Sequence, residues 1–444
     1  MSRLRSFASR SLLVIAIAMT TLGSRPVPSS HEQVLYSFQN TAQDGNTPFA
    51  GLIFDTAGNL YGTTAFGGNG GCPSAEFPGC GTVFELSPES GGGWTETVLY
   101  NFQQDGSDGI YPYADVILDA SGNLYGTTEG GGSGGECSSN GFPGCGTVFE
   151  LSPQSGGRWT ESVLHSFQNN LQDGIIPFAG LILDASGNLY GTTGFGGTTS
   201  HGTVFELLPQ SGGGWAEAVL HSFNGTDGND PGGSLILDAV GNLYGTAQSG
   251  GSSGCTINAV GCGTVFELSP NSGGHWTEKV LHTFQNNGRD GNNPIGGLIF
   301  DAAGNLYGAT GAGGSAGAGT VFQLKQQSGG GWAEQVLYTF SGTGKDGSAP
   351  TAGLVLDKGG NLIGTALGGR GQIGGGVVFE VRRIKGGAYA ERLLYDFMGR
   401  AGDGIDPEGG VILDTAGNLY GTTAFGGSSI CGAQTCGTVF ELTP

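Results

Sequence analysis

The stretch Leu-Ile-Phe-Asp-Ala-Ala-Gly-Asn-Leu-Tyr-Gly, residues 298–308, decides the fold because close copies of it recur along the chain. Its central string is Gly-Asn-Leu-Tyr-Gly, with Ile363 replacing the Tyr in one copy. Copies spaced 54 to 65 residues apart indicate a repeat architecture in which each copy is one structural unit. The Asn of the string stands at Asn59, Asn123, Asn188, Asn242, Asn305, Asn361 and Asn418.

Two further strings also recur in every unit, Gly-Thr-Val-Phe-Glu-Leu and Val-Leu-Tyr-x-Phe, with small variations. In the first unit these strings predict four short strands over residues 52–55, 60–64, 82–86 and 94–102. Gly58 and Asn59 between the first two strands tolerate the positive φ of a tight hairpin. Four strands in about 60 residues are typical of a β-propeller blade, whereas a β-helix coil needs a shorter repeat.

The two ends of the sequence complement each other. The seventh unit stops at residues 441–444, after its third strand, and the missing fourth strand is found at residues 33–38. A closed ring explains both facts and removes exposed sheet edges, whereas a linear array would need atypical capping units. The sequence therefore predicts an all-β, seven-bladed β-propeller over residues 33–444. Each blade has four antiparallel strands, and the N-terminal strand completes the last blade.

The pattern at residues 298–308, followed by Gly319-Thr320-Val321-Phe322, resembles the GloVer tandem repeat of the choice-of-anchor family of secreted bacterial proteins. The resemblance covers about residues 33–444. It implies export, often with a C-terminal sorting signal, and brings no established activity or catalytic residues. Residue 444 ends the last strand without a sorting tail, a departure that leaves surface attachment open.

Composition excludes several classes of protein. Of the 444 residues 92 are Gly and only 12% are charged, which argues against a helical or coiled-coil protein. The net charge of −21 argues against sequence-independent binding of nucleic acid, because phosphate contacts need a positive surface. The sequence also has no nucleophile motif and no phosphate-binding loop between a strand and a helix. We therefore expect no nucleic-acid partner.

The N-terminus predicts a secretory signal peptide over residues 1–24, followed by a short linker over residues 25–32. Arg3, Arg5 and Arg10 precede an apolar run at residues 12–19, and small and polar residues follow as far as Ser24. The run is too short to span a bilayer, which takes about 20 apolar residues. We expect a secreted, periplasmic or cell-surface monomer with no membrane span after cleavage.

All eight cysteines lie between the second and third strands of four units, and these loops are longer than their cysteine-free equivalents. Export favours disulfides, whereas zinc binding is disfavoured because the spacings differ and three of the four loops have no nearby His. The expected local pairs are Cys72 with Cys80, Cys137 with Cys145, Cys255 with Cys262, and Cys431 with Cys436.

Every unit has an Asp-Gly-x-x-Pro string in the loop that enters its innermost strand. These carboxylates could form a ring at the channel mouth that attracts Ca²⁺, or they could brace the turn. A residue present in all units usually serves the unit, which favours the turn, and we expect no cofactor. His165, His221 and His282 replace Tyr36 or Tyr100 of other units and are interpreted as wall residues. The Asp residues are Asp44, Asp108, Asp173, Asp227, Asp290, Asp346 and Asp403.

Positions at which the units differ are the better candidates for a binding site. Just before the innermost strands most units carry small residues, whereas three units carry aromatic or acidic ones. Aromatic and carboxylate side chains around the top opening suit saccharide or cation recognition, and paired carboxylates could hydrolyse a glycosidic bond. Drift at solvated loop tips is the alternative. The residues concerned are Tyr111, Tyr113, Asp115, Asp230, Asp406 and Glu408.

A second asymmetry is a basic surface in the two bottom turns of the sixth unit. Lys358, Arg382, Arg383 and Lys385 would form a positive area on an acidic molecule, able to bind an anionic partner or another copy. An eroded blade explains the same residues.

Three functions remain open from the sequence. The first is a secreted non-enzymatic propeller that binds a polysaccharide or surface protein at the top of the channel. The second is a carbohydrate hydrolase or lyase whose acids are among Asp115, Asp230, Asp406 and Glu408. The third is a structural envelope protein. Propellers host all three roles, so the fold does not choose among them.

Overall fold

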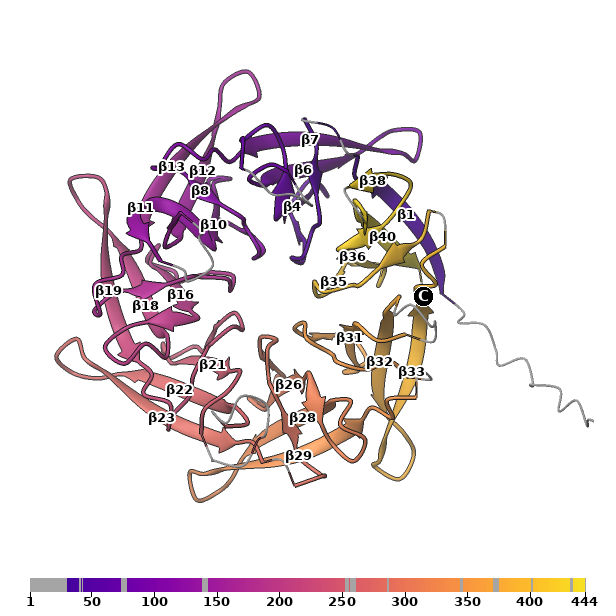
Figure 1. The fold of residues 1–444 in the computed structure, drawn as a ribbon. Helices are drawn as coiled ribbons and strands as arrows, with labels where there is room; N and C mark the ends of the chain where they lie inside the picture. Colours follow the sequence, from indigo (N-terminus) through magenta and orange to yellow (C-terminus); the bar gives the residue numbers. More distant parts are fainter. Residues whose placement is uncertain are drawn as a thin grey trace, which may run out of the picture.

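A computed structural model shows seven four-stranded antiparallel sheets arranged as a ring around a central axis (Figure 1). It describes residues 30–39, 41, 43–72, 78–137, 143–251, 255, 261–285, 287–343, 346–369, 375–400, 402–431 and 434–443. Strands are the only regular secondary structure in these ranges. The predicted seven-bladed β-propeller is confirmed. The predicted signal peptide lies outside the described residues.

Each blade begins with a short strand next to the axis and ends with a long strand at the rim, as Figure 1 shows. The last blade takes its outer strand from the N-terminus. From axis to rim the blades are β3 (Ile53–Phe54), β4 (Leu60–Thr64), β6 (Thr82–Pro88), β7 (Trp94–Asn101); β9 (Ile117–Leu118), β10 (Leu124–Thr128), β12 (Thr147–Gln154), β13 (Arg158–Ser166); β15 (Ile182–Leu183), β16 (Leu189–Thr193), β18 (Thr203–Pro209), β19 (Trp215–Ser222); β20 (Ile236–Leu237), β21 (Leu243–Ala247), β22 (Thr264–Pro270), β23 (Trp276–Thr283); β25 (Ile299–Phe300), β26 (Leu306–Thr310), β28 (Thr320–Gln326), β29 (Trp332–Thr339); β30 (Val355–Leu356), β31 (Leu362–Ala366), β32 (Val377–Arg383), β33 (Tyr389–Asp396); and β35 (Ile412–Leu413), β36 (Leu419–Thr423), β40 (Thr438–Thr443), β1 (His31–Ser37).

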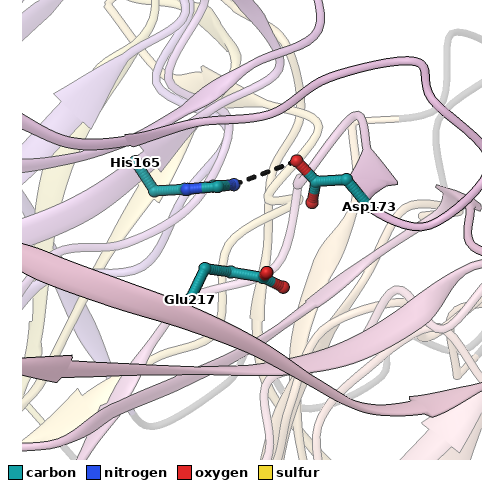
Figure 2. Close-up of side chains that lie close together, drawn as sticks. All are labelled: His165, Asp173 and Glu217. Atoms are coloured by element: carbon teal, nitrogen blue, oxygen red, sulfur yellow. Dashed lines mark hydrogen bonds and ion pairs between the residues drawn. The ribbon is translucent and has the colours of Figure 1, made fainter.

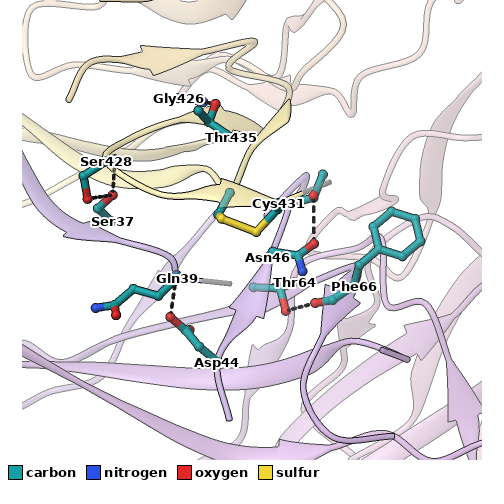
Figure 3. Close-up of a disulfide and its surroundings, with 12 residues drawn as sticks. Ser37, Gln39, Asp44, Asn46, Thr64, Phe66, Gly426, Ser428, Cys431 and Thr435 are labelled. Atoms are coloured by element: carbon teal, nitrogen blue, oxygen red, sulfur yellow. Dashed lines mark hydrogen bonds between the residues drawn. A yellow bond between two sulfur atoms is a disulfide. The ribbon is translucent and has the colours of Figure 1, made fainter. Parts of the chain in front are cut away.

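The ring closes as predicted, by antiparallel pairing of β1 with β40. His31 lies opposite Thr443, and Ser37 lies opposite Thr438. Figure 3 shows the end of β1 against the last blade, where the Ser37 and Ser428 hydroxyls lie 3.1 Å apart. The pairing covers the outer edge of β40, which would otherwise be open to another chain.

In five blades a short ribbon joins the two kinds of loop at the top, the loop that enters the innermost strand and the loop that follows the second strand. In the fourth and sixth blades a single bridge joins them, Asn229 with Ser249 and Ser348 with Gly368. In the first blade Gly45 pairs with Gly67 and Asn46 pairs with Phe66. The two loops therefore share one face, as predicted. The ribbon strands are β2 (Gly45–Asn46), β5 (Phe66–Gly67), β8 (Gly109–Ile110), β11 (Gly130–Glu136), β14 (Gly174–Ile175), β17 (Phe195–Gly196), β24 (Gly291–Asn292), β27 (Ala312–Gly313), β34 (Gly404–Ile405) and β37 (Phe425–Gly426), with a hairpin of β38 (Ile430–Cys431) and β39 (Gln434–Thr435) in the last blade.

The core lies between blades and rests on a repeated pair of phenylalanines. Phe102, which follows the outer strand of the first blade, is fully buried and meets Phe149 of the second blade edge-on at 5.1 Å. The last Gly of each central string makes room for the ring of the inner Phe. In the second blade, for example, a Cβ at Gly126 would lie 2.6 Å from Phe149 Cζ. Because the pair recurs at all seven junctions, each blade is held by its neighbours. The other pairs are Phe38–Phe84, Phe167–Phe205, Phe223–Phe266, Phe284–Phe322, Phe340–Phe379 and Phe397–Phe440.

The bottom hairpin of each blade is organised by the Asp that precedes it. Asp55 accepts hydrogen bonds from the backbone N–H groups of Ala57 and Asn59 at 2.8 and 2.9 Å. The Asn59 amide donates to its second oxygen at 2.8 Å. Burial alone would raise the pKa of Asp55, but these hydrogen bonds to the charged form outweigh burial and lower it.

All four predicted disulfides are present, Cys72–Cys80, Cys137–Cys145, Cys255–Cys262 and Cys431–Cys436. They close loops of the top face, and Figure 3 shows the last of them. Among the described residues, no helix has the length and apolar character needed to cross a membrane.

Candidate functional site

A cavity of about 640 Å³ occupies the centre of the ring and is walled by the innermost segments of all seven blades. Most of the wall is Gly, Ala and the first residues of the inner strands. Small residues bring the backbones of neighbouring blades together; for example, a Cβ on Gly296 would lie 2.6 Å from the backbone carbon of Ala352. Larger side chains therefore stand out where they occur.

The larger aromatic side chains of the cavity wall belong to the first three blades. Phe49 and Tyr113, each the residue after the Pro of its loop, stack with ring centroids 5.1 Å apart and an interplanar angle of 27°. Phe66 meets Tyr113 edge-on at 6.2 Å. Phe178 is the equivalent residue in the third blade and also lines the cavity. Half-buried rings of this kind offer flat apolar surface to a ligand.

Three carboxylates line the same cavity, Asp115, Glu129 and Glu408. Burial raises the pKa of Glu129 to about 7. Burial and the nearby charge of Asp406 raise the pKa of Glu408 to about 7. Burial also raises the pKa of Asp115. All three groups therefore hold a proton more readily than exposed carboxylates do, and a positively charged or hydroxyl-rich ligand would relieve their desolvation.

Tyr111, Asp230 and Asp406 share a different position, immediately before the Pro of the entering loop, and they are absent from the cavity wall. Their φ values are 60°, 60° and 55°, in the left-handed region. The equivalent residues of the other four blades also have positive φ, so this strain belongs to the loop and not to a particular site. Tyr111 is buried against Phe66, at a centroid distance of 5.3 Å.

The structure thus brings three of the six predicted residues, Tyr113, Asp115 and Glu408, into one cavity. Glu129 was missed. It could have been detected as a difference between units, since the other units have Ala, Gly, Gln or Leu at its position. Phe49 and Phe178 were also missed, although each is an aromatic residue directly after the Pro of its loop. Aromatic residues after the Pro in three consecutive units were the signal.

The cavity wall is acidic. Among the described residues that line it there is no Lys, Arg or His, whereas three are carboxylic acids. The cavity therefore disfavours anionic ligands, and this selectivity strengthens as the carboxyl groups lose their protons.

The Asp residues of the entering loops lie elsewhere, at the junctions between blades, where six are buried and Asp403 is half-buried. The described residues that line the cavity therefore include no ring of these carboxylates. Asp44 braces its turn by accepting the Gln39 N–H at 2.7 Å, as drawn in Figure 3. It also accepts the Tyr36 hydroxyl at 3.0 Å. Burial raises its pKa. The turn interpretation describes these contacts better than the Ca²⁺ ring.

The three His residues take the place of this Tyr in consecutive junctions. His165 Nε2 lies 3.1 Å from Asp173 Oδ2, and Glu217 of the next outer strand lies beside them (Figure 2). β13 has a β-bulge between Val163 and His165, and the outer strands of the other blades have the same irregularity. The predicted wall residues are therefore half-buried contacts between blades.

The basic residues Lys358, Arg382, Arg383 and Lys385 are exposed in or next to the two bottom turns of the sixth blade. Lys358 Nζ donates a hydrogen bond to the Thr415 carbonyl at 2.5 Å. Arg392 lies on the outer strand β33 and is paired with Glu380 at 2.8 Å, so it adds no free charge to this surface.

Comparison with protein families gives two overlapping matches to the Gloeobacter/Verrucomicrobia repeat, at residues 133–343 and 256–444. Together they cover well over half of the chain. The chain belongs to this repeat family. The Gloeobacter/Verrucomicrobia repeat corresponds here to propeller blades, since the matched ranges run from β11 to the end of β40. The resemblance found in the sequence is confirmed. A search of curated proteins finds no match.

Two solved structures are similar to this Gloeobacter/Verrucomicrobia repeat chain. The extracellular domain of the putative one-component system BT4673 from B. thetaiotaomicron matches with a TM-score of 0.51 and 12% identity, over 94% of this chain and 42% of that one. PorZ, a surface component of the type-IX secretion system of Porphyromonas gingivalis, gives a TM-score of 0.48 and 14% identity, over 92% and 47%. The chain spans less than half the length of either, and at 12% identity the match to the BT4673 domain shows similarity of fold alone.

Proposed function

We propose that this chain is an extracellular, non-enzymatic propeller that binds a neutral or amino-substituted saccharide in the central cavity. The observation that carries the proposal is the stacked pair Phe49 and Tyr113 beside Glu129 and Glu408 on one side of the cavity. Aromatic faces pack against the C–H faces of sugar rings, while carboxylates accept hydrogen bonds from hydroxyl or ammonium groups.

Placement outside the cytoplasm rests on the disulfides. Four disulfides in one chain are typical of oxidising compartments, because cytosolic reductants keep thiols reduced. The signal peptide expected at residues 1–24 is consistent with this placement. Expression with and without residues 1–24, followed by recovery from culture medium, periplasm and cytoplasm, tests both inferences.

The binding test is a glycan array on the oxidised protein, followed by titration of the best ligand. Tyr113→Ala removes one face of the stacked pair and should weaken binding by about 10-fold or more. Glu408→Gln should weaken an amino sugar more than a neutral one, because it removes the charge but keeps an acceptor.

Thr351→Ala is the matched control, because Thr351 lines the cavity at the equivalent position of the sixth blade, away from the aromatic residues. It should leave affinity within about twofold. Equal loss of binding in Tyr113→Ala and Thr351→Ala would contradict the proposed location, and the absence of any glycan bound would contradict the proposed ligand class.

A second candidate, a carbohydrate hydrolase or lyase, is favoured by one observation. Glu129 and Glu408 have pKa values of about 7, as a general acid at neutral pH requires. Release of reducing sugar that stops in both Glu129→Gln and Glu408→Gln would favour the enzyme. Binding without product release would favour the non-enzymatic function, and neither binding nor release would favour a structural envelope protein.

The exposed bottom surface formed by Lys358, Arg382, Arg383 and Lys385 is proposed as a separate contact for an anionic partner. Reversing Arg382 and Arg383 to Glu should abolish any salt-sensitive association. The same change should leave glycan binding in the cavity unaltered.

A further inference from the structure

The His residues between the second and fifth blades each belong to a group of three potential metal ligands. His165, Asp173 and Glu217 contribute one ligand atom each, and these atoms lie within 4.8 Å of one another. The same distance limit holds for His282, Asp290 and Glu334. The His and the Asp come from adjacent blades, and the Glu lies on the outer strand next to the Asp. The sites are therefore formed only when the ring assembles.

The carboxylates of these two groups have buried oxygens without a hydrogen-bond donor. Asp173 is 8% exposed, and its Oδ1 has no partner. Asp290 is 7% exposed, and its Oδ1 also has no hydrogen-bond partner. Figure 2 shows the free oxygen of Asp173 on the side of its carboxylate that faces Glu217. Glu217 Oε1 and Glu334 Oε1 are also buried without a donor. Buried charged oxygens need a donor or a cation, because desolvation is otherwise uncompensated.

The spacing suits a small divalent cation. His165 Nε2 and Asp173 Oδ2 are 3.1 Å apart, and His282 Nε2 and Asp290 Oδ2 are 3.3 Å apart. Two ligands of one tetrahedral Zn²⁺, each about 2.1 Å from the metal, lie about 3.4 Å from each other, close to both observed distances. A cation would also neutralise the two carboxylates. An imidazole nitrogen with carboxylate oxygens is a ligand set suited to zinc and its first-row neighbours.

The third group, His221, Asp227 and Glu278, differs in the hydrogen bonds that its Asp accepts. The Asn224 side-chain amide donates to Asp227 Oδ2 at 2.6 Å, and the Asn224 backbone N–H donates to Oδ1 at 2.9 Å. Both oxygens of Asp227 are thus supplied with donors. In the first two groups the oxygen that faces the His also accepts a backbone N–H, from Gln168 or Gln285. The difference is therefore the second Asp oxygen, which has no donor in Asp173 and Asp290 and has one in Asp227.

Four other junctions replace the His with Tyr36, Tyr100, Tyr338 or Tyr395. At the Tyr36 junction the hydroxyl donates to Asp44, and Glu96 lies close enough to Asp44 for their charges to interact. The neutral Tyr36 side chain donates a hydrogen bond and does not bind a metal. The neighbouring carboxyl groups of Asp44 and Glu96 reduce their mutual repulsion by sharing a proton instead. The His junctions differ by a nitrogen lone pair that can bind a metal.

We propose that the chain binds two Zn²⁺ ions between blades, one at His165, Asp173 and Glu217 and one at His282, Asp290 and Glu334. Each ion ties together the outer strands of two neighbouring blades. Water completes the coordination, since the side chains of His165 and His282 are 21% and 20% exposed.

The test uses the oxidised protein, stripped with a chelator and dialysed against ZnCl₂, with bound zinc measured by elemental analysis and titration calorimetry. We expect two equivalents per chain. His165→Tyr and His282→Tyr should each remove one equivalent, and the double variant should remove both. Tyr is the residue that four other junctions already carry, so these variants should keep the fold, which circular dichroism checks.

Three controls make the result specific. His221→Tyr should leave two equivalents bound, because Asn224 already occupies that junction. His275→Asn, an exposed His of a bottom turn, should also leave two. Glu217→Gln should remove one equivalent, whereas Glu96→Gln at a Tyr junction should remove none.

Zinc should also raise the melting temperature of the wild-type protein but not of the His165→Tyr/His282→Tyr variant. Failure to retain zinc, or equal retention in that double variant, would overturn the proposal and leave proton sharing as the explanation of the orphaned oxygens. A third equivalent lost in His221→Tyr would overturn the restriction to two junctions.

Discussion

The hydroxyl of Thr422 in the last blade donates a hydrogen bond of 2.6 Å to the backbone carbonyl of Ala50 in the first blade. The same bond joins Thr63 to the carbonyl of Ala114, from the first blade to the second. The junction that closes the ring therefore has the same inner-wall bond as four other junctions, while the pairing of β1 with β40 completes it at the rim. The ring is therefore closed by contacts at both the inner wall and the outer rim.

Removal of residues 1–38 should destabilise the protein strongly, because it exposes the edge of β40 and deletes the buried side chains of Leu35 and Phe38. Loss of a buried Leu or Phe typically costs about 3–5 kcal/mol each. We expect aggregation, or a melting temperature lowered by more than about 10 °C. The matched control lacks residues 1–29 and keeps β1, and it should melt like the full chain. Equal melting temperatures for the two truncations would contradict the closed ring.

Stability should fall as the pH rises from about 4.5 to about 8, with Glu96 as one cause. Burial and the charge of Asp44 raise the pKa of folded Glu96 to about 8, from about 4.5 when unfolded. The folded state therefore holds the extra proton, and the stabilisation is complete below pH 4.5 and lost as the pH passes 8. For a half-buried group screened by solvent, we expect about 1–2 kcal/mol.

Glu96→Gln should remove that contribution, which urea unfolding at pH 5 and pH 8 would show as a smaller stability difference than in the wild type. Glu89→Gln in the exposed turn is the control and should preserve the difference. An unchanged pH dependence in Glu96→Gln would show that this carboxyl group is ionised in the folded protein.

The bottom turns should respond to acid in the opposite direction. Hydrogen bonds lower the pKa of Asp55 below its ordinary 3.8, so its stabilisation is present above pH 3.8 and is lost as the pH falls through the folded value. Asp55→Ala should cost about 2 kcal/mol at pH 7, as expected for hydrogen bonds to a charged acceptor. The cost should shrink below pH 3. A cost independent of pH would mean that the turn relies on Gly58 and not on the carboxylate.

Reduction of the disulfides should lower stability without opening the ring. Each closes a loop of 5 to 8 residues and should contribute about 2 kcal/mol on the chain-entropy model. The Cys72→Ser/Cys80→Ser variant should therefore melt at a lower temperature than the wild type under oxidising conditions. After reduction of all remaining disulfides in both proteins, the difference between their melting temperatures should shrink. Loss of the native circular dichroism spectrum on reduction alone would contradict this local role.

The fold was predictable because each unit repeats the same local information. Gly58 and Asn59 marked a hairpin, the alternation of Trp94 and Glu96 with Thr95 and Thr97 marked a half-buried strand, and the displaced strand at residues 33–38 marked closure. These signals are short-range or repeated seven times, so one sequence was enough to detect them.

The site was only partly predictable. Tyr113 and Glu408 reach the cavity because the residue after the Pro faces the axis, whereas Tyr111 and Asp406, two positions earlier, lie behind it. That alternation depends on a positive φ before the Pro, which is unusual for residues other than Gly and invisible in the sequence. The His165 group was missed because its members come from adjacent units and meet only where two blades pack together.

The pairing of His31 with Thr443 has a consequence for how the chain could be rewired. Because β1 and β40 pair in one sheet, the fold does not depend on where the chain begins and ends within the ring. A short linker from residue 443 to residue 30, with new termini in an exposed turn such as residues 89–93, should therefore yield a circular permutant with the same seven blades. In this permutant every blade except the newly opened one would have four strands that are consecutive in the sequence. Its folding would show whether the ring forms when the strands are synthesised in a different order.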